Sequence, residues 1–207
     1  MNERFMPSVR EQNSDLIEQF VASFAAFGEM TARADDEAAL SLAVGPPGEH
    51  GFRRWKPLKL QTDVGALEAI YSKLPARLPR LFEELVLCYR WAEVDLERFT
   101  LLANPPGDDL MGLYAAMSSD NYLWIHLVPS GFLRLAKGPG GDYDPVCFDI
   151  RSRKKSGDCP IVKIDHEQIL CNDRIQVVGE LAPSFLNLLQ TRIERAKLKG
   201  LFESDKR

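Results

Sequence analysis

The sequence has few cysteines and no close pair of them. Among 207 residues there are four, Cys88, Cys147, Cys159 and Cys171, and none stands in a Cys-x-x-Cys spacing. Zinc sites usually include one such pair, because a tight turn fixes two ligands at little entropic cost. The even spacing of the last three, with His166 among them, is therefore weak support for zinc. We expect buried free thiols, no metal and no cofactor.

Long apolar runs and an excess of positive charge are also absent. The longest mainly apolar run, residues 20–27, is far shorter than the roughly 20 residues that span a bilayer. The first residues have neither the hydrophobic core nor the cleavage site of a signal peptide. The net charge of -4 gives no general attraction to nucleic acid or anionic membranes, and mildly favours a basic partner. We expect a cytoplasmic protein that binds neither membrane nor nucleic acid.

A recognisable catalytic constellation is missing too. Cys159, Asp165 and His166 are the residue types of a thiol hydrolase. However, Cys159 precedes a proline at a strand start, and no helix follows it to form an oxyanion hole. We therefore expect no enzyme, while a small cysteine hydrolase that uses Cys159 and His166 stays an alternative.

What the sequence does contain is helical periodicity followed by strands. Apolar spacing predicts helices over 14–27, 63–71, 79–89, 108–117 and 184–197, where Asp108 or Asp109 caps the fourth. Residues 122–128 fit either a strand or a helix. Strands are predicted at 131–136, 146–150, 161–164 and 174–178. Helices before and after a run of strands indicate an α+β fold, with a mostly antiparallel sheet and helices packed on one face.

A break near residue 50 suggests how the chain is divided. The Gly-Pro-Pro-Gly run at 45–48 interrupts regular structure. We interpret residues 1–50 as an N-terminal helical extension and linker, and residues 51–207 as the main α+β domain.

The most unusual stretch is residues 137–149, KGPGGDYDPVCFD, which holds three glycines, two prolines and three aspartates. A phosphate loop would lead into a helix, whereas this stretch leads into a strand. Asp142, Asp144 and Asp149 are suitable calcium ligands, but Asp149 lies along the strand and breaks the spacing of a calcium loop. We expect a structural turn, with Gly140 and Gly141 at positive φ and Asp142 bonded to the turn backbone.

Four motifs in order resemble a known family. Their residues are LPRLFEEL at 78–85, FLRLAKGPGGDYDPVCFD at 132–149, PIVKIDHE at 160–167 and SFLNLL at 184–189. Together they resemble the SUKH superfamily, which includes yeast cell-wall-synthesis regulators and bacterial toxin-immunity proteins. The resemblance covers residues 60–190 and implies a SUKH-like fold and a role in occluding toxins.

The function we expect is that of a non-catalytic protein-binding module, which the resemblance narrows to an immunity protein that blocks a bacterial toxin. A regulatory scaffold that docks cellular proteins is the alternative. The expected contact residues are Asp142, Tyr143, Asp144, Asp149 and Asp165. The alternation of Val146, Phe148 and Ile150 assigns the other strand face to the core, so Asp149 is expected on the outer face. Acidic groups there would steer a basic partner, such as a nuclease toxin.

Overall fold

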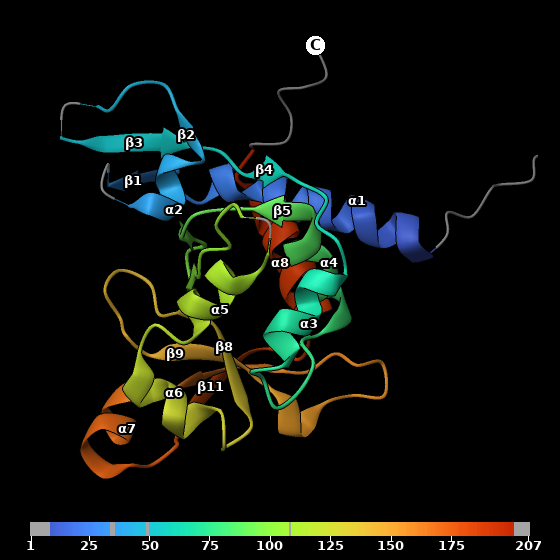
Figure 1. Ribbon diagram of the computed structural model, residues 1–207, viewed down its shortest axis with the longest axis vertical. Coiled ribbons are helices and arrows are strands. Elements are labelled where there is room, and N and C mark those ends of the chain that lie inside the picture. The colour runs from blue at the N-terminus through green and yellow to red at the C-terminus, as the bar shows by residue number, and fades with distance from the viewer. Residues whose placement is uncertain (1–8, 34–35, 49, 108, 201–207) are drawn as a thin grey trace, which may run out of the picture.

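An antiparallel sheet organises the chain, as the sequence predicted. The computed structural model describes residues 9–33, 36–48, 50–107 and 109–200 (Figure 1). Within these ranges, six strands pair antiparallel in the order β11-β10-β9-β8-β7-β6. Their bounds are β6 Val94–Asp95, β7 Thr100–Leu101, β8 Phe132–Lys137, β9 Pro145–Asp149, β10 Ile161–Ile164 and β11 Val177–Ala182. The fold is α+β.

Two predicted helices pack on one face of this sheet, α4 (Arg80–Cys88) and α8 (Phe185–Leu198). Ser184 caps the start of α8, since its Oγ accepts a hydrogen bond from the Asn187 N–H (3.1 Å). Asp158 supplies a second capping acceptor, because its Oδ1 accepts a hydrogen bond from the Phe185 N–H at 2.9 Å. These acceptors satisfy N–H groups that have no partner within the helix. The capped helix then buries its apolar stripe on the sheet.

The opposite face of the sheet is also covered, which the sequence did not predict. Figure 1 shows α6 (Asn121–Leu127) and α7 (His166–Asn172) on the far side of the sheet from α4 and α8. A second apolar cluster fills the space between them, formed by Leu123, Leu127, Phe132, Cys147, Val162, Ile164 and Ile169. Strand β9 is therefore buried on both faces. The expectation that its alternate residues face solvent is wrong, because these two helices cover them.

Capping aspartates explain why these two short helices form. The Asp120 side chain accepts a hydrogen bond from the Leu123 N–H, and that of Asp165 accepts one from the Gln168 N–H, both at 3.0 Å. The segment 122–128, which fitted either element, is thus helical as far as Leu127. Similarly, Asp109 accepts from the Met111 N–H at the start of α5 (Met111–Met117), whereas Asp108 lies outside the described residues.

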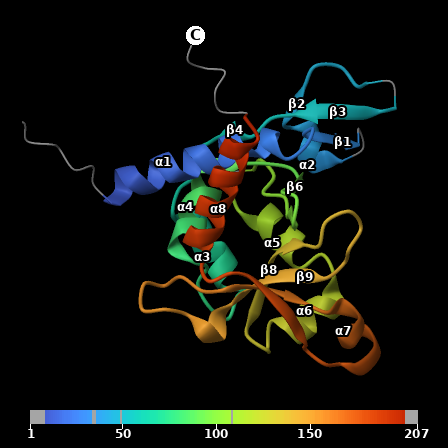
Figure 2. The same ribbon diagram turned by 180° about the vertical axis from the view of Figure 1, so that it is seen from behind.

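The N-terminal region belongs to the same packed unit. Helix α1 (Val9–Ala22) continues into a 3-10 turn, Ser23–Ala26, and α1 crosses α8 (Figure 2). Strand β3 (Phe52–Trp55) pairs with both β1 (Thr31–Arg33) and β2 (Ala43–Val44). The boundary expected near residue 50 thus runs through one small sheet. A helix forms where one was predicted, but it begins at Val9 and not at residue 14, and the described residues of 9–50 do not form a separate extension.

The remaining elements connect these parts. Strands β4 (Leu58–Lys59) and β5 (Tyr89–Arg90) pair with each other, and β5 contacts α4. Helix α3 (Gly65–Tyr71) contacts α5, and α2 (Glu37–Leu40) lies between β1 and β2 in the chain. A 3-10 turn, Ile150–Ser152, follows β9. No helix in the described ranges is long and apolar enough to cross a bilayer.

Candidate functional site

The glycine-rich stretch forms the turn between β8 and β9, called here the Tyr143 turn (residues 138–144). Gly140 and Gly141 have φ of 62° and 91°, in the left-handed region that side chains disfavour. The Asp142 Oδ1 accepts a hydrogen bond from the Asp144 N–H at 2.9 Å. Both features match the turn that the sequence predicted. They hold the backbone on either side of Tyr143 in one conformation.

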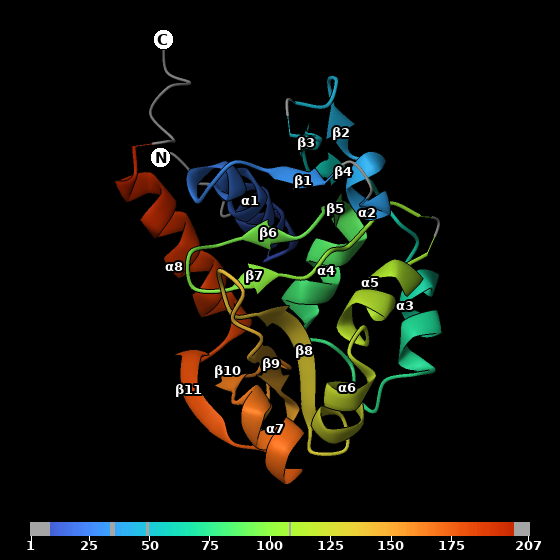
Figure 3. The ribbon, with the colours of Figure 1, turned by 90° about the vertical axis from the view of Figure 1, so that its left-hand side faces the viewer.

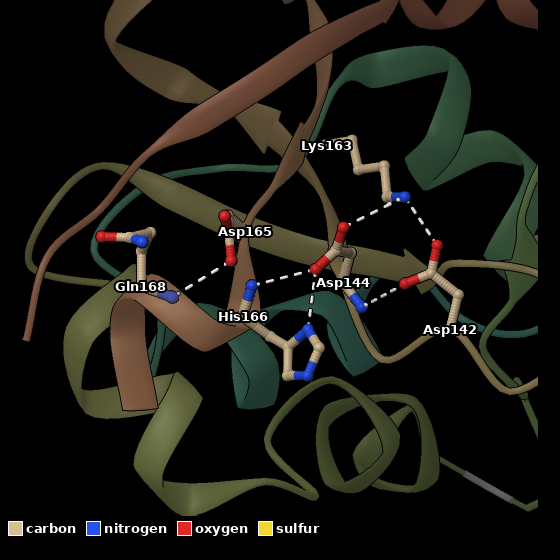
Figure 4. A network of polar contacts seen from close by, with 6 residues as sticks. All are labelled: Asp142, Asp144, Lys163, Asp165, His166 and Gln168. Atoms are coloured by element: carbon tan, nitrogen blue, oxygen red, sulfur yellow. Dashed lines mark hydrogen bonds and ion pairs between the residues drawn. The ribbon is translucent and has the colours of Figure 1, made fainter. Parts of the chain in front are cut away.

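A lysine on a neighbouring strand binds both aspartates of the turn. The Lys163 Nζ lies 2.6 Å from the Asp142 Oδ2 and 3.0 Å from the Asp144 Oδ2 (Figure 4). The hydrogen bond to Asp142, and then the two carboxylate charges, raise the pKa of Lys163 against the opposing effect of burial. The ammonium neutralises part of the negative charge that the sequence assigned to this surface.

A histidine binds the same network from α7. The His166 N–H donates to the Asp144 Oδ1 at 3.0 Å, and the ring Nδ1 lies 2.7 Å from that oxygen. Burial tends to raise the pKa of Asp144, but hydrogen bonds from His166 and Lys163 hold it below its ordinary value. The Asp144 carboxylate therefore joins the turn, β10 and the first residue of α7.

Sequence reasoning missed Lys163 and His166 as partners of the turn. A signal for them was present, since antiparallel pairing places the end of β10 beside the start of β9. In the structure, Lys163 pairs with Val146, two residues beyond Asp144. Combining the predicted strand order with charge would have placed a cation beside these carboxylates.

Tyr143 is the exposed member of the turn. Its residue surface is 68% exposed, and its ring centroid lies 6.1 Å from that of His166. The side chains of Asp142 and Asp144 are 32% and 18% exposed. The turn therefore presents an aromatic ring to solvent above partly buried, ion-paired carboxylates.

The two other predicted contact residues have structural roles. The carboxylate of Asp165 caps α7 and points toward Gln168 rather than toward the turn (Figure 4). Asp149, expected on an exposed outer face, is only 6% exposed and lies at the other end of β9. Its oxygens accept from the Arg151 Nε at 2.8 Å and Nη2 at 2.9 Å, and these bonds lower its pKa. The assignment of Asp149 to the exposed face is wrong, because its carboxylate is buried and pairs with the side chain of Arg151, which itself faces solvent.

Three side chains in the network have the chemistry of metal ligands. One atom each of Asp142, Asp144 and His166 lies within 4.8 Å of the others. However, the Lys163 ammonium already contacts both carboxylates, and a divalent cation would have to displace it. The zinc set considered from the sequence does not come together here, since Cys147 is buried in the second apolar cluster and Cys171 is exposed. We treat the network as an ion-paired scaffold for the turn.

The geometry does not support the cysteine hydrolase. Cys159 is 0% exposed, and burial raises the pKa of its thiol to about 12. A catalytic cysteine needs a thiolate near neutral pH and a base in hydrogen-bond reach. His166 instead directs its Nδ1 to Asp144.

Removing the Asp144 charge should weaken the fold in a pH-dependent way. We expect Asp144→Asn to lower the free energy of unfolding by about 1–2 kcal/mol at pH 7, since charge-assisted hydrogen bonds are lost. The pKa of Asp144 is depressed below its ordinary value of 3.8, so its contribution is complete above that value and is lost as the pH falls through the lower, folded pKa. The difference between the two proteins should therefore shrink below about pH 4, as measured by urea unfolding across pH.

Glu194→Gln is the matched control, because Glu194 is exposed on α8 and changes charge by the same amount. It should alter stability by less than about 0.5 kcal/mol. Equal stability of the Asp144→Asn variant and the native protein at pH 7 would show that the network does not stabilise the turn.

Searches against protein-family models and against curated proteins found no match for this chain. The resemblance to the SUKH superfamily therefore stays a prediction.

Proposed function

We propose that the protein is a non-catalytic protein-binding module that contacts its partner through the Tyr143 turn. The observation that carries this proposal is the 68% exposure of Tyr143 on a turn whose backbone is fixed by Lys163 and His166 through the two aspartates.

An exposed tyrosine on a rigid turn is well suited to anchor an interface. Tyrosine supplies a large contact area and one hydroxyl, and it is enriched among residues that dominate binding energy. Binding usually costs entropy because loops and side chains must be ordered. Here Gly140, Gly141 and the Asp144 contacts already restrict the turn, which lowers that cost.

The resemblance to SUKH proteins supports a toxin as the partner and an immunity role for this protein. The ion pairs with Lys163 change which part of the turn should matter most. The aspartates are partly neutralised within the protein, so they should guide a basic partner less than free carboxylates would. We infer that the Tyr143 ring, and not the acidic charge, is the main anchor.

The test replaces Tyr143 by alanine. We expect the binding free energy to weaken by about 1–3 kcal/mol, which corresponds to a roughly five- to 150-fold loss of affinity. The melting curve should stay unchanged because the ring is exposed. The partner is first captured by a photo-crosslinking amino acid at position 143 in the native host, and its affinity is then measured by calorimetry. Val64→Ala is the control, since Val64 is 62% exposed at the start of α3.

Two outcomes would contradict the proposal. One is an affinity unchanged by Tyr143→Ala, and the other is an equal loss in the Val64→Ala variant. Co-expression with the product of the neighbouring gene distinguishes the immunity role from the alternative, a regulatory scaffold. Rescue from a toxic product favours immunity, whereas capture of a housekeeping protein favours the scaffold.

A further inference from the structure

A cleft of about 680 Å³ lies between the outer strands of two sheets. β1 is one of the two edge strands of the three-stranded sheet, and β6 is one of the two edge strands of the six-stranded sheet. Residues of both strands line the cleft, and Figure 3 shows β1 above β6. Trp55, which is 2% exposed, also lines it, and its indole N–H has no acceptor among the described residues.

The edge of β6 supplies a backbone that can accept another strand, whereas on β1 the Thr31 N–H already donates to the Glu29 carbonyl oxygen and the Arg33 carbonyl oxygen already accepts from the Asp36 N–H. In the described part of the chain, neither β1 nor β6 pairs with a strand on its outer side. An outer strand carries N–H and C=O groups that an extended peptide can bind, and side-chain pockets then provide selectivity. The cleft volume is within the range of pockets that hold drug-sized ligands. An occupant in the extended conformation is therefore the one that this geometry favours.

The charges that line the cleft select the sign of the occupant. Among the described lining residues there are four carboxylates and two cations, namely Glu29, Asp36, Glu93 and Asp95 against Arg33 and Lys137. The Lys137 Nζ lies 2.7 Å from the Glu93 Oε2, so these two charges compensate each other. Glu29 and Asp95 are exposed and have no ion-pair partner among the described residues. The cleft therefore favours a positively charged occupant.

We propose that this cleft binds an extended, lysine- or arginine-rich segment of a partner protein as an added strand. The cleft adjoins the surface already described, since Lys137 lines it and immediately precedes the Tyr143 turn. In the cleft, Glu29 and Asp95 contact the basic side chains of the partner. Their charges are not neutralised as those of Asp142 and Asp144 are. The cleft contact does not require the Tyr143 contact, so either proposal can fail alone.

The experiment uses a fluorescein-labelled hexapeptide with alternating lysine and valine, titrated with the full chain and followed by fluorescence anisotropy. We expect saturable binding that weakens with salt, and no binding of the matched peptide with glutamate in place of lysine. Combining Glu29→Gln and Asp95→Asn should reduce affinity about three- to tenfold. Two further peptides are N-methylated, one at its odd-numbered and one at its even-numbered amides. At least one of the two should no longer bind, since methylation blocks backbone pairing on one edge of the peptide.

The control for charge is Glu180→Gln combined with Glu194→Gln, because both residues are exposed and neither lines the cleft. The control for site is Val178→Pro on β11, the opposite free edge of the six-stranded sheet, where Val178 is 48% exposed. Binding lost in Val178→Pro but kept in the cleft variant would assign the peptide to β11 and overturn the proposal. Absence of binding, or equal binding of the glutamate peptide, would also overturn it. Tyr143→Ala should leave peptide affinity unchanged.

Discussion

Replacing Phe185 by alanine should lower the free energy of unfolding by about 3–5 kcal/mol. Phe185 is 0% exposed at the start of α8. Its ring packs edge-on against three others, with centroids 5.2 Å from Phe82, 5.8 Å from Phe148 and 6.4 Å from Phe20. The substitution removes apolar contacts with α4, β9 and α1 at once, and the surrounding backbone can only partly close the resulting cavity.

For a chain of this length the same loss should lower the melting temperature by roughly 6–20 °C. Urea unfolding measures the free energy directly. Phe185→Leu is the matched variant, and it should cost clearly less because most of the apolar volume is kept. Phe52→Ala changes a phenylalanine that is 47% exposed and should cost far less than Phe185→Ala. A loss of under 1 kcal/mol in the Phe185→Ala variant would show that this aromatic cluster does not hold the core together.

The sheet and the helices that flank it could be predicted because they depend on local periodicity. Strand alternation at 131–136, 146–150 and 161–164, and helical spacing at 79–89 and 184–197, correspond to β8, β9, β10, α4 and α8. The interpretation of β9 was incomplete because the alternating pattern shows which residues share a face, but not what covers the second face. Cys147 is apolar enough to be buried there once α6 and α7 pack against it.

The division of the chain could not be predicted from composition. Gly-Pro-Pro-Gly at 45–48 does interrupt regular structure, but it does so between β2 and β3 of one small sheet. The ring of Phe24 lies 6.5 Å from that of Trp91, so the N-terminal segment packs into the main core. Strand pairing and core contacts of this kind depend on residues far apart in the sequence.

The site shows the same contrast between local and long-range information. Gly140 and Gly141 required a turn, and the side chain of Asp142 bonds its backbone, as predicted. The electrostatic character of the turn was not predictable in this way, because Lys163 and His166 reach it from β10 and α7. Counting carboxylates in a sequence treats them as free charges, whereas their effect on a partner depends on the cations that the fold places beside them.

Replacing Arg90 by alanine should also lower the free energy of unfolding strongly, by about 2–4 kcal/mol. Arg90 is 0% exposed. Its Nη1 donates to the carbonyl oxygens of Tyr89, at 3.0 Å, and of Val86. Its Nη2 donates to the Thr62 Oγ1. The Val86 carbonyl lies in the last turn of α4 and the Tyr89 carbonyl just beyond that helix, where the helix supplies no donors. Burial lowers the pKa of Arg90, which indicates that the surroundings disfavour its charge. Arg90→Met, which keeps much of the volume and removes the charge, should therefore cost clearly less than Arg90→Ala.

A second donor makes the hydrogen-bond contribution measurable. The Asn104 Nδ2 donates to the same carbonyls, at 3.1 Å for Val86 and 2.7 Å for Tyr89. In the Arg90→Met variant these carbonyls still accept hydrogen bonds from Asn104, and in the Asn104→Ala variant they still accept them from Arg90. The double variant leaves two buried carbonyls without a side-chain donor, so its loss should exceed the sum of the single losses by about 1 kcal/mol. Urea unfolding of the four proteins gives this coupling energy. Additive losses would contradict the shared role, because they would mean that the carbonyls find water when either donor is removed.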